Sequence, residues 1–410
     1  MASHDVLVVG GGISGLALAW KAAQEGRRVL LLERSGRTGG CLHSERTTDG
    51  YWFELGAHTT YNSYGAFLDI AVGAGVAGLV RERGPARSRM GLLSHGTYHW
   101  LTPPKVLLQL NWLEALVHLP IGLLSSKEGQ TIYSRFSRLL GRGNYDRVLG
   151  PFLAAVPSQR ADGFPLAGPG SLFKKRPRRQ DFVRSFGFEG GLQVVCDAAA
   201  RTRGLTVETD VTVEAIGRRG DGFTVTTADG RTLEAPALAL AVPTDAAVTL
   251  LRPQFGELAS QLARVGTAVV DSLGLVLPRE KAWLPECAFL VPVDDLFFSC
   301  VTRDPFPDPA RRAFAFHFRP GLTRAERLAR ALEVLKVTEA DLLHLAERRC
   351  TLPSPALGHG TIVADLDHQL AGSRLMLTGN YFDGLAIEDC VGRSFAEWKR
   401  VAPALGAAAT

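Results

Sequence analysis

Residues 5–33 read DVLVVGGGISGLALAWKAAQEGRRVLLLE, and this stretch decides how the chain begins to fold. Its first apolar run, Val6–Val9, is rich in β-branched residues, as a buried parallel strand requires. A glycine-rich turn separates that run from a helical pattern that begins at Ile13 and continues to about Gln24. A second apolar run then ends at Glu33. The order strand, turn, helix, strand predicts a βαβ unit in a parallel sheet, and hence an α/β fold.

The glycine-rich turn has the GxGxxG spacing of dinucleotide-binding proteins. Gly10 permits a tight turn, Gly12 lets the backbone approach a pyrophosphate, and Gly15 lets the helix pack closely on the strand. The amides at the helix N-terminus would face the phosphates. Glu33 can accept the ribose hydroxyl protons of an adenosine, and its charge disfavours the 2′-phosphate of NADP. The contacts predicted here are those of Gly10, Gly12, Ile13, Ser14, Gly15 and Glu33.

The next segment, ERSGRTGGCLHSE, bears on which dinucleotide is bound. Arg37 and a second glycine turn follow Glu33 and supply further donors for a pyrophosphate. The segment resembles the ExxxRxGG pattern of the FAD-dependent amine oxidase superfamily. That superfamily includes flavin monoamine oxidases, protoporphyrinogen oxidases and phytoene-type desaturases. The resemblance implies FAD as the cofactor, with contacts from Arg34, Arg37, Gly39 and Gly40.

The resemblance extends along most of the chain. GYWFELGAHTTY, residues 50–61, is similar to the segment that passes beside the flavin ring in this superfamily. It implies that Gly56, Ala57 and His58 line the isoalloxazine. In GLTVETDVTVEAI, Val211 takes the position that presents backbone groups to the adenine.

The motif LMLTGNYFDGLAIEDC, near the other end of the chain, resembles the last motif of the superfamily. By this resemblance Gly379 and Asn380 meet the pyrophosphate and the ribitol. Leu385, Ala386 and Ile387 would begin a helix that faces the N1–O2 edge of the flavin. Reduced flavin is anionic at that edge, and a helix N-terminus stabilises an anion by up to ~1–2 kcal/mol. Two distant glycine turns are therefore predicted to hold opposite ends of one FAD.

The chain has 410 residues, of which 46% are hydrophobic, and this length predicts two domains. The expected fold is a discontinuous Rossmann-type FAD-binding domain plus an α+β substrate domain with an antiparallel sheet. We assign residues 1–65, 185–248 and 355–405 to the FAD-binding domain, and residues 66–184 and 249–354 to the substrate domain. The segment from TAVVDSLGLVL to FAFHF alternates apolar residues as antiparallel strands do. LTRAERLARALEVLKVTEADLLHLAER predicts two helices, with Thr323 and Thr338 as N-caps.

The formal charge of +5 is modest, and arginines are spread along the chain, so no nucleic-acid partner is expected. One basic run, KKRPRR at 174–179, is interpreted as a solvated loop, with a docking patch for an anionic partner as the alternative. The six cysteines form no CxxC pair, so no metal site is predicted. With no secretion signal, a reduced, cytoplasmic location is expected.

The stretch VLLQLNWLEALVHLPIGLL, residues 106–124, is apolar but contains Asn111, Glu114 and Pro120. A membrane span needs ~20 residues with few polar groups, so a transmembrane helix is not predicted. A buried helix pair or the wall of a substrate channel is the favoured interpretation, and peripheral membrane contact is the alternative.

The resemblance implies an FAD-dependent oxidase or dehydrogenase that removes hydride from C–H or C–N bonds of a hydrophobic small molecule. The electrons would pass to molecular oxygen or another acceptor. The wording GNYxxGxxIxDC is closest to protoporphyrinogen oxidases. The alternatives are a carotenoid or isoprenoid desaturase, an amine oxidase, a flavin-dependent isomerase and a partner protein that binds FAD structurally. No lysine lies between Ala282 and Leu335, and this argues against an amine oxidase.

Flavin N5 would be the main reactive centre, because a flavin can take hydride without a side-chain base. His58 is the one titratable residue expected near the ring, either as a catalytic group or as part of the pocket wall. Arg87 and Arg89 are candidates for substrate carboxylates, since arginine pairs with them bidentately, although a surface position is the alternative. His95 and His99 have the spacing of metal ligands but no acidic or cysteine partner, and no metal is expected.

Overall fold

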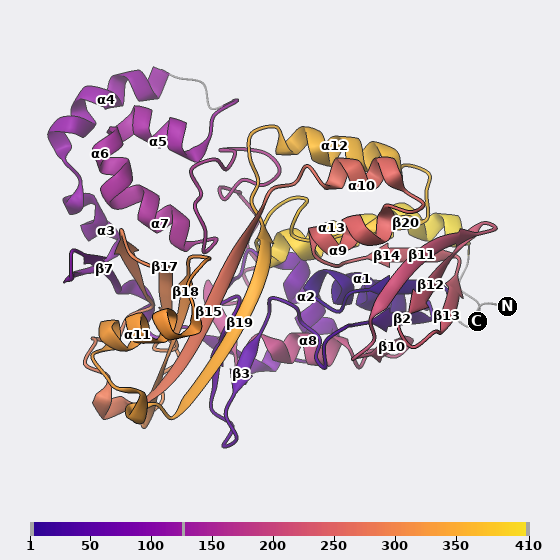
Figure 1. Cartoon of the computed structure of the whole chain (residues 1–410), viewed down its shortest axis with the longest axis horizontal. Coiled ribbons are helices and arrows are strands. Elements are labelled where there is room, and N and C mark those ends of the chain that lie inside the picture. Colours follow the sequence, from indigo (N-terminus) through magenta and orange to yellow (C-terminus); the bar gives the residue numbers. More distant parts are fainter. Residues whose placement is uncertain (1–3, 125–127, 407–410) are drawn as a thin grey trace.

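The computed structural model describes residues 4–124 and 128–406. Figure 1 shows two sheet-based domains side by side, with a group of helices (α3–α7) at the far corner of one of them. One domain contains a parallel sheet between helices, and the other contains a long, twisted sheet that is mainly antiparallel. This confirms the predicted α/β fold class.

The parallel sheet has five strands in the order β10-β2-β1-β14-β20. The strands are β1 (Val6–Val9), β2 (Val29–Leu32), β10 (Leu205–Glu208), β14 (Ala237–Leu240) and β20 (Leu375–Leu377). They come from three separate parts of the chain, so the domain is discontinuous, as predicted. β1, β2, β14 and β20 are fully buried, because helices or a second sheet cover both faces.

Two hydrophobic cores flank this sheet. One lies under α1 (Ile13–Gln24), α2 (Gly65–Gly73), α8 (Gln193–Ala199) and α13 (Ile387–Val401). The other contains α9 (Thr244–Leu251), α10 (Gly256–Leu262), α12 (His359–Leu370) and a small antiparallel sheet of β11 (Val213–Arg219), β12 (Gly222–Thr227) and β13 (Thr232–Ala235). α2 and α10 lie in residues that we assigned to the substrate domain, yet they pack on the cofactor sheet.

The substrate sheet has seven strands in the order β19-β15-β18-β17-β16-β7-β8. The strands are β7 (Met90–Ser94), β8 (Thr97–Leu101), β15 (Thr267–Pro278), β16 (Phe289–Val293), β17 (Phe297–Thr302), β18 (Arg311–Phe318) and β19 (His344–Pro353). Every neighbouring pair is antiparallel except β16 with β7. One face packs against α11 (Arg324–Leu335), and the other meets the cofactor domain through Phe53 and Leu55.

Thr323 caps α11 through a capping box, as predicted. The prediction of a second helix in this region is wrong. Thr338 caps only a 3-10 turn at Glu339–Asp341, and the chain then enters β19, which pairs with β15 over ten residues. Long-range pairing overrode the local helical pattern here.

The helix group consists of α3 (Pro103–Val106), α4 (Trp112–Leu124), α5 (Ile132–Leu140), α6 (Arg142–Asn144) and α7 (Gly150–Ala155). For the apolar stretch 106–124, a buried helix pair or the wall of a substrate channel was the favoured prediction. Several large side chains of α4 are exposed, so α4 is not a buried helix, while Gln109, Leu110 and Asn111 of the same stretch line a cavity. No helix in the described residues is long and apolar enough to cross a membrane.

Short strands connect the two domains. They are β3 (Ser44–Arg46), β4 (Trp52–Glu54), β5 (Thr60–Tyr61), β6 (Val80–Glu82) and β9 (Ser185–Phe188). β3 pairs with β4, while β9 lies between β5 and β6. The segment that follows β4 carries the residues predicted to lie beside the flavin ring.

Candidate active site

The glycine turn at residues 10–15 and the glycine turn that follows β20 lie next to each other in the structure. The Ser394 hydroxyl, on α13, donates to the carbonyl of Ser14 on α1 over 2.8 Å. The same hydroxyl lies 2.7 Å from Oγ1 of Thr378, at the end of β20. Contacts of α13 with α1 and with the end of β20 therefore bring together residues from opposite ends of the chain.

The first turn leaves an open space in front of Gly12. A Cβ on Gly15 would lie 1.9 Å from the carbonyl oxygen of Gly10, so only glycine lets α1 approach β1 this closely. Gly10 has φ +102°, a left-handed conformation that favours glycine. By contrast, a Cβ on Gly12 would meet only the Gly40 Cα, at 3.8 Å. The backbone of Gly12 thus faces a cradle that a ligand can fill.

Glu33 is held at the rim of this cradle. Its carboxylate accepts from the amides of Gly11 (2.6 Å) and Ser35 (2.8 Å), and a carboxylate has further lone pairs for ribose hydroxyls. The Val211 amide donates to the Glu33 carbonyl over 2.9 Å, which leaves the Val211 carbonyl as its remaining backbone group. The side chain of Arg34 is exposed.

The second glycine turn packs on the first. The Gly39 amide donates to the Gly11 carbonyl over 2.8 Å, and a Cβ on Gly40 would lie 2.8 Å from the Gly12 Cα. Arg37 donates to the carbonyls of Thr38 and Gly40, each over 2.8 Å. Arg37 therefore shapes the loop through its carbonyl groups, which differs from the predicted role as a phosphate donor.

Arg348, on β19, reaches the same place from the other domain. Its Nη2 donates to the Gly40 carbonyl over 2.7 Å. Its Nη1 is buried, hydrogen-bonds none of the described residues, and lies 3.2 Å from the position of a Cβ on Gly56. A buried donor without an acceptor, beside an open cradle, fits a cofactor that brings acceptor oxygens. Arg348 was not among the predicted site residues, because its segment was interpreted as a helix.

Cys41 and Cys350 also meet at this junction. The pKa of the Cys41 thiol falls to about 6, chiefly because the Cys350 thiol hydrogen-bonds to it, with the charges of Arg348 and Arg37 also lowering it. The pKa of Cys350 rises correspondingly. Neither cysteine was predicted to take part in the site.

The segment expected beside the flavin ring is tightly packed. A Cβ on Gly56 would lie 2.1 Å from the Cys41 carbonyl oxygen, and the Ala57 amide donates to that oxygen over 2.9 Å. Next in the chain, the Nε2 atoms of His58 and His317 are 2.7 Å apart. Nδ1 of His317 lies 2.8 Å from the hydroxyl of Ser272. The sequence predicted His58, but not its two partners.

Burial keeps these two imidazoles neutral. It lowers the pKa of His58 well below the usual range, with smaller contributions from His317 and Arg83. It lowers the pKa of His317 to about 4, with the charge of Arg348 adding to the effect. A neutral imidazole has one donor and one acceptor nitrogen, so the pair can hold or move a proton.

The last motif forms the turn from β20 to α13. Thr378 separates β20 from Gly379 and Asn380, and Gly379 is buried. Leu385 precedes Ala386, which is the N-cap of α13, and Ile387 begins the helix. The first amides of a helix have no acceptor within it, so this end of α13 can bind an anion.

The basic run beside α13 is not a solvated loop throughout. Lys174 and Arg176 both bind Oδ1 of Asp389, at 3.0 and 2.6 Å, and the side chain of Asp389 is only 8% exposed. Two cations therefore neutralise a carboxylate in the first turn of α13. The favoured interpretation of the run was wrong for these two residues.

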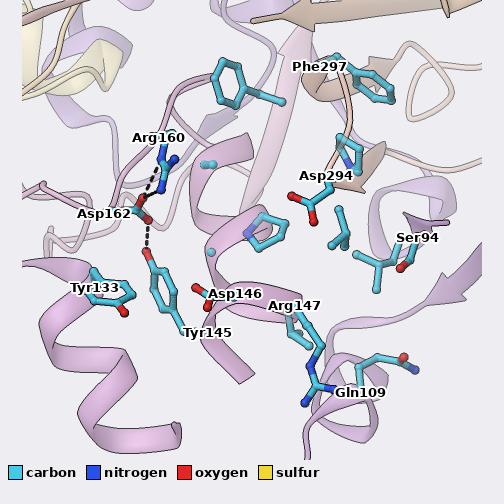
Figure 2. A pocket seen from close by; sticks show the side chains of 18 of the residues that line it. Ser94, Gln109, Tyr133, Tyr145, Asp146, Arg147, Arg160, Asp162, Asp294 and Phe297 are labelled. Atoms are coloured by element: carbon cyan, nitrogen blue, oxygen red, sulfur yellow. Dashed lines mark hydrogen bonds and ion pairs between the residues drawn. The ribbon is translucent and has the colours of Figure 1, made fainter. Parts of the chain in front are cut away.

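A cavity of about 1000 Å³ lies between the helix group and the β7, β16 and β17 part of the substrate sheet. Figure 2 shows Arg160 and Tyr145 directed at Asp162 on one side, with Asp294 on the opposite side. Nε of Arg160 and the Tyr145 hydroxyl donate to Asp162 over 2.9 and 2.6 Å. Ionisable lining residues include His95, His99, Asp146, Arg147, Arg160, Asp162, Asp294 and Arg319.

Arg87 and Arg89, the predicted substrate residues, do not line this cavity. Both are exposed. Arg87 bonds to the carbonyl of Arg83 and pairs with Glu82, while Arg89 donates to the carbonyl of Glu286. The arginines that reach the cavity are Arg147, Arg160 and Arg319, which sequence spacing alone did not single out.

A discontinuous dinucleotide domain, joined to a sheet that carries a large polar cavity, defines a two-domain oxidoreductase. The chain belongs to the family of flavin-containing amine oxidoreductases, whose model matches residues 13–336. It is therefore a flavin-dependent enzyme. The open cradle at Gly12 and the unpaired Nη1 of Arg348 fit such a cofactor.

Individual relatives agree with this assignment. The chain is 25% identical to the coproporphyrinogen III oxidase of Propionibacterium freudenreichii subsp. freudenreichii, over 95% of this chain and 89% of that protein. A proposed protoporphyrinogen oxidase from Exiguobacterium sp. 255-15 shares the fold with a TM-score of 0.80 at 19% identity, over 98% of this chain and all of that one. Cyclohexylamine oxidase from Brevibacterium oxydans IH-35A aligns with a TM-score of 0.70 at 16% identity, over 98% of each chain.

Proposed function

We propose that the protein is an FAD-dependent oxidase or dehydrogenase of porphyrinogens, the reduced macrocycles that carry carboxylate side chains. The observation that carries this proposal is the large cavity that Arg147, Arg160 and Arg319 line together with Asp146, Asp162 and Asp294, in a chain related over most of its length to a coproporphyrinogen oxidase. FAD is favoured over a smaller flavin because Glu33 and the Gly12 cradle serve only the AMP half of a dinucleotide.

The lining of the cavity favours an amphiphilic substrate over a purely hydrophobic one. Arg319 lies with its guanidinium 5.3 Å from the Phe298 ring, and its Nε is buried and hydrogen-bonds none of the described residues. Such a group can pair with a carboxylate of a flat, partly apolar ligand. A carotenoid-like polyene offers no partner for the buried Nε of Arg319, and leaving such a donor unpaired is costly. This argues against the desaturase alternative.

The chemistry asks little of side chains beyond positioning. Bound flavin supplies a hydride acceptor, and each two-electron step also releases one proton from the substrate. The chain must hold the reacting carbon ~3–3.5 Å from the acceptor atom and exclude water. Arg147 and Arg319 would orient the substrate carboxylates, while His58 lies in the segment expected beside the ring. The electrons would then pass to molecular oxygen or another acceptor.

Anaerobic bleaching of the flavin tests the proposal. Purified protein loaded with FAD is mixed in turn with coproporphyrinogen, protoporphyrinogen, a primary amine and a polyene, and the absorbance of oxidised flavin is followed. We expect loss of that absorbance with a porphyrinogen only. Arg319→Met should raise KM about tenfold or more, because a charged hydrogen bond is worth ~1.5–3 kcal/mol. Bleaching only by the amine or the polyene would refute the substrate, and failure to bind FAD would refute the cofactor.

We further propose that α4 makes a peripheral membrane contact. Leu113, Leu116 and Val117 are 78%, 62% and 70% exposed, and Leu108 is 73% exposed just before the helix. Figure 1 places α4 at the outer corner of the molecule, away from the cofactor domain. Lys105, which is exposed shortly before α4, favours an anionic lipid surface.

Flotation with vesicles tests this contact. The protein should float with vesicles rich in anionic lipid, and the double variant L113E/V117E should not float. Val72→Glu is a matched control, because Val72 is an exposed apolar residue, 48% accessible, on α2 of the other domain. Equal flotation of all three proteins, or of none, would exclude α4 as the membrane contact.

A further inference from the structure

A row of polar side chains crosses the substrate sheet beside the flavin site. Ser272 on β15 is opposite Arg348 on one side and opposite His317 on the other, and His317 is opposite Ser299 on β17. Residues directly opposite in antiparallel strands point to the same face of a sheet. Since Arg348 reaches the Gly40 carbonyl and His317 reaches His58, this face is the one that meets the cofactor domain.

Buried polar groups in a sheet of this kind are expensive unless they are paired. His317 and Ser272 are only 4% and 5% exposed, and Ser299 is 1% exposed without a hydrogen-bond partner for its hydroxyl. An apolar row would pack equally well against Phe53 and Leu55, which cover the neighbouring part of the sheet. The presence of this polar row at the flavin-facing position points to a role in the chemistry.

The hydrogen bonds in this row form a chain with two arrangements. In one, His58 donates from Nε2 to His317, which donates from Nδ1 to the Ser272 hydroxyl. In the other, Ser272 donates to Nδ1 of His317, which donates from Nε2 to His58. The measured separations of 2.7 and 2.8 Å suit both arrangements. Nδ1 of His58 hydrogen-bonds none of the described residues. Because the His58 ring is only half-buried, this end of the hydrogen-bonded row is open.

We propose that His58, His317 and Ser272 form a proton relay that takes up the proton released when the substrate is oxidised. This rests on the proposed function only in that hydride leaves the substrate and one proton must follow. Nδ1 of His58 accepts that proton, and Nε2–H of His58 passes to Nε2 of His317. Nδ1–H of His317 passes to the Ser272 oxygen, whose own hydroxyl proton leaves to water. The electron pair leaves with the hydride to FAD, so none moves through the relay.

Return of the relay to its first arrangement follows from the second half of the reaction. A two-electron acceptor such as oxygen takes up one hydride equivalent and one proton. Passage of that proton from Ser272 back to His58 restores the original tautomers. Each N–H or O–H bond that breaks is replaced by another, and the cycle is closed.

The charged groups around the relay favour neutral imidazoles. Arg83 faces His58, and Arg348 faces His317 from β19. Glu54 lines the same small pocket as His58 and Arg83, but its carboxylate accepts from Ser44 and from the Leu192 amide. With two arginines nearby and this carboxylate engaged elsewhere, proton transfer through exchange of tautomers is favoured over a lasting imidazolium.

A substrate-free measurement tests the relay first. Imidazole 15N–1H NMR spectra of the FAD-loaded protein should show two neutral, coupled histidines between pH 5 and 8. Ser272→Ala should change the tautomer populations of both rings. Ser299→Ala is the matched control, since Ser299 lies opposite the same histidine and its hydroxyl hydrogen-bonds none of the described residues, and it should change neither. Independent titration of the two rings near their usual pKa, or unchanged tautomers in Ser272→Ala, would overturn the proposal.

A kinetic measurement then tests whether the relay is used. His317→Gln retains a hydrogen-bonding group near His58 but cannot pass a proton onward. We expect it to bind FAD as the wild type does, and to slow anaerobic flavin bleaching by coproporphyrinogen by roughly 10²-fold or more, as loss of acid–base help does. An unchanged bleaching rate in His317→Gln would refute the relay. A wild-type protein that no porphyrinogen bleaches would instead refute the proposed substrate, and the NMR result would still decide the relay.

Discussion

Replacing Gly12 with alanine separates the folding of the cofactor domain from the binding of the cofactor. Gly12 has φ −65° and ψ 172°, a conformation that alanine adopts without strain. The added Cβ would meet only the Gly40 Cα, at 3.8 Å, which is an ordinary contact. The free protein should therefore keep its stability within about 0.5 kcal/mol. The methyl group would instead occupy the space in which we place the pyrophosphate.

The loss of affinity can be worked from the same geometry. Displacing the pyrophosphate breaks at least one charge-assisted hydrogen bond, worth ~1.5–3 kcal/mol, and crowding by an extra methyl group adds ~1–3 kcal/mol. A total of about 2.5–6 kcal/mol raises the Kd for FAD by roughly 10²-fold to 10⁴-fold. Titration by flavin fluorescence measures this, and urea unfolding of the apoprotein measures stability.

Gly15→Ala is the matched comparison. Its Cβ would lie 1.9 Å from the Gly10 carbonyl oxygen, so this variant should lose both stability and FAD affinity. Gly12→Ala that binds FAD within about threefold of the wild type, a difference of ~0.6 kcal/mol, would show that the dinucleotide does not lie against this turn.

Three further predictions concern affinity, pH and stability. Arg348→Met removes the 2.7 Å bond to the Gly40 carbonyl and the unpaired Nη1, and it should weaken FAD binding about tenfold. Arg349→Met should leave FAD binding unchanged, because the Arg349 side chain is 69% exposed. Equal affinities of the two variants would exclude Arg348 from the site. Burial raises the pKa of Glu54 to about 7, so its contribution to stability is complete below about pH 4.5 and is lost as pH rises through 7. The free energy of unfolding of the wild type, relative to that of Glu54→Gln, should therefore fall by up to about 3 kcal/mol across that pH window. A difference that stays constant with pH would contradict this. Asp304→Asn should lower the free energy of unfolding in urea by about 3–5 kcal/mol, because it leaves the 4% exposed Arg312 without its buried partner. Glu234→Gln, in the exposed pair with Arg219, should lower it by less than about 1 kcal/mol. Similar losses of unfolding free energy in both variants would refute the role of burial.

Local chemistry predicted most of the cofactor domain. The β1 strand, the turn at Gly10 and the helix α1 each depend on residues close together in sequence, and the structure forms them as expected. The structure also brings the two ends of the chain together, because Ser394 of α13 bonds to Ser14 of α1. Binding of one cofactor by the two turns stays a prediction. β14 lies between β1 and β20 in the parallel sheet, so the turns that follow β1 and β20 lie at the same edge of it.

The other half of the site could not be predicted in this way. Arg348, His317 and Ser272 become neighbours only through the register of three strands, and one of those strands was predicted as a helix. The cavity arginines likewise depend on how the helix group packs on the sheet. The sequence could not decide between burial and exposure of the apolar face of α4, because an apolar helix pattern is the same whether the partner is a protein core or a lipid surface.

The pairing of α1 with α13 also sets an order of events during synthesis. A nascent chain can form β1, β2 and α1 early, but β20 and α13 emerge from the ribosome more than 330 residues later. Until then α1 lacks the partner whose Ser394 ties it in place, and the anion-binding end of α13 does not exist. Flavin capture is therefore a late step, and chains that stop short of residue 401 should be released without it.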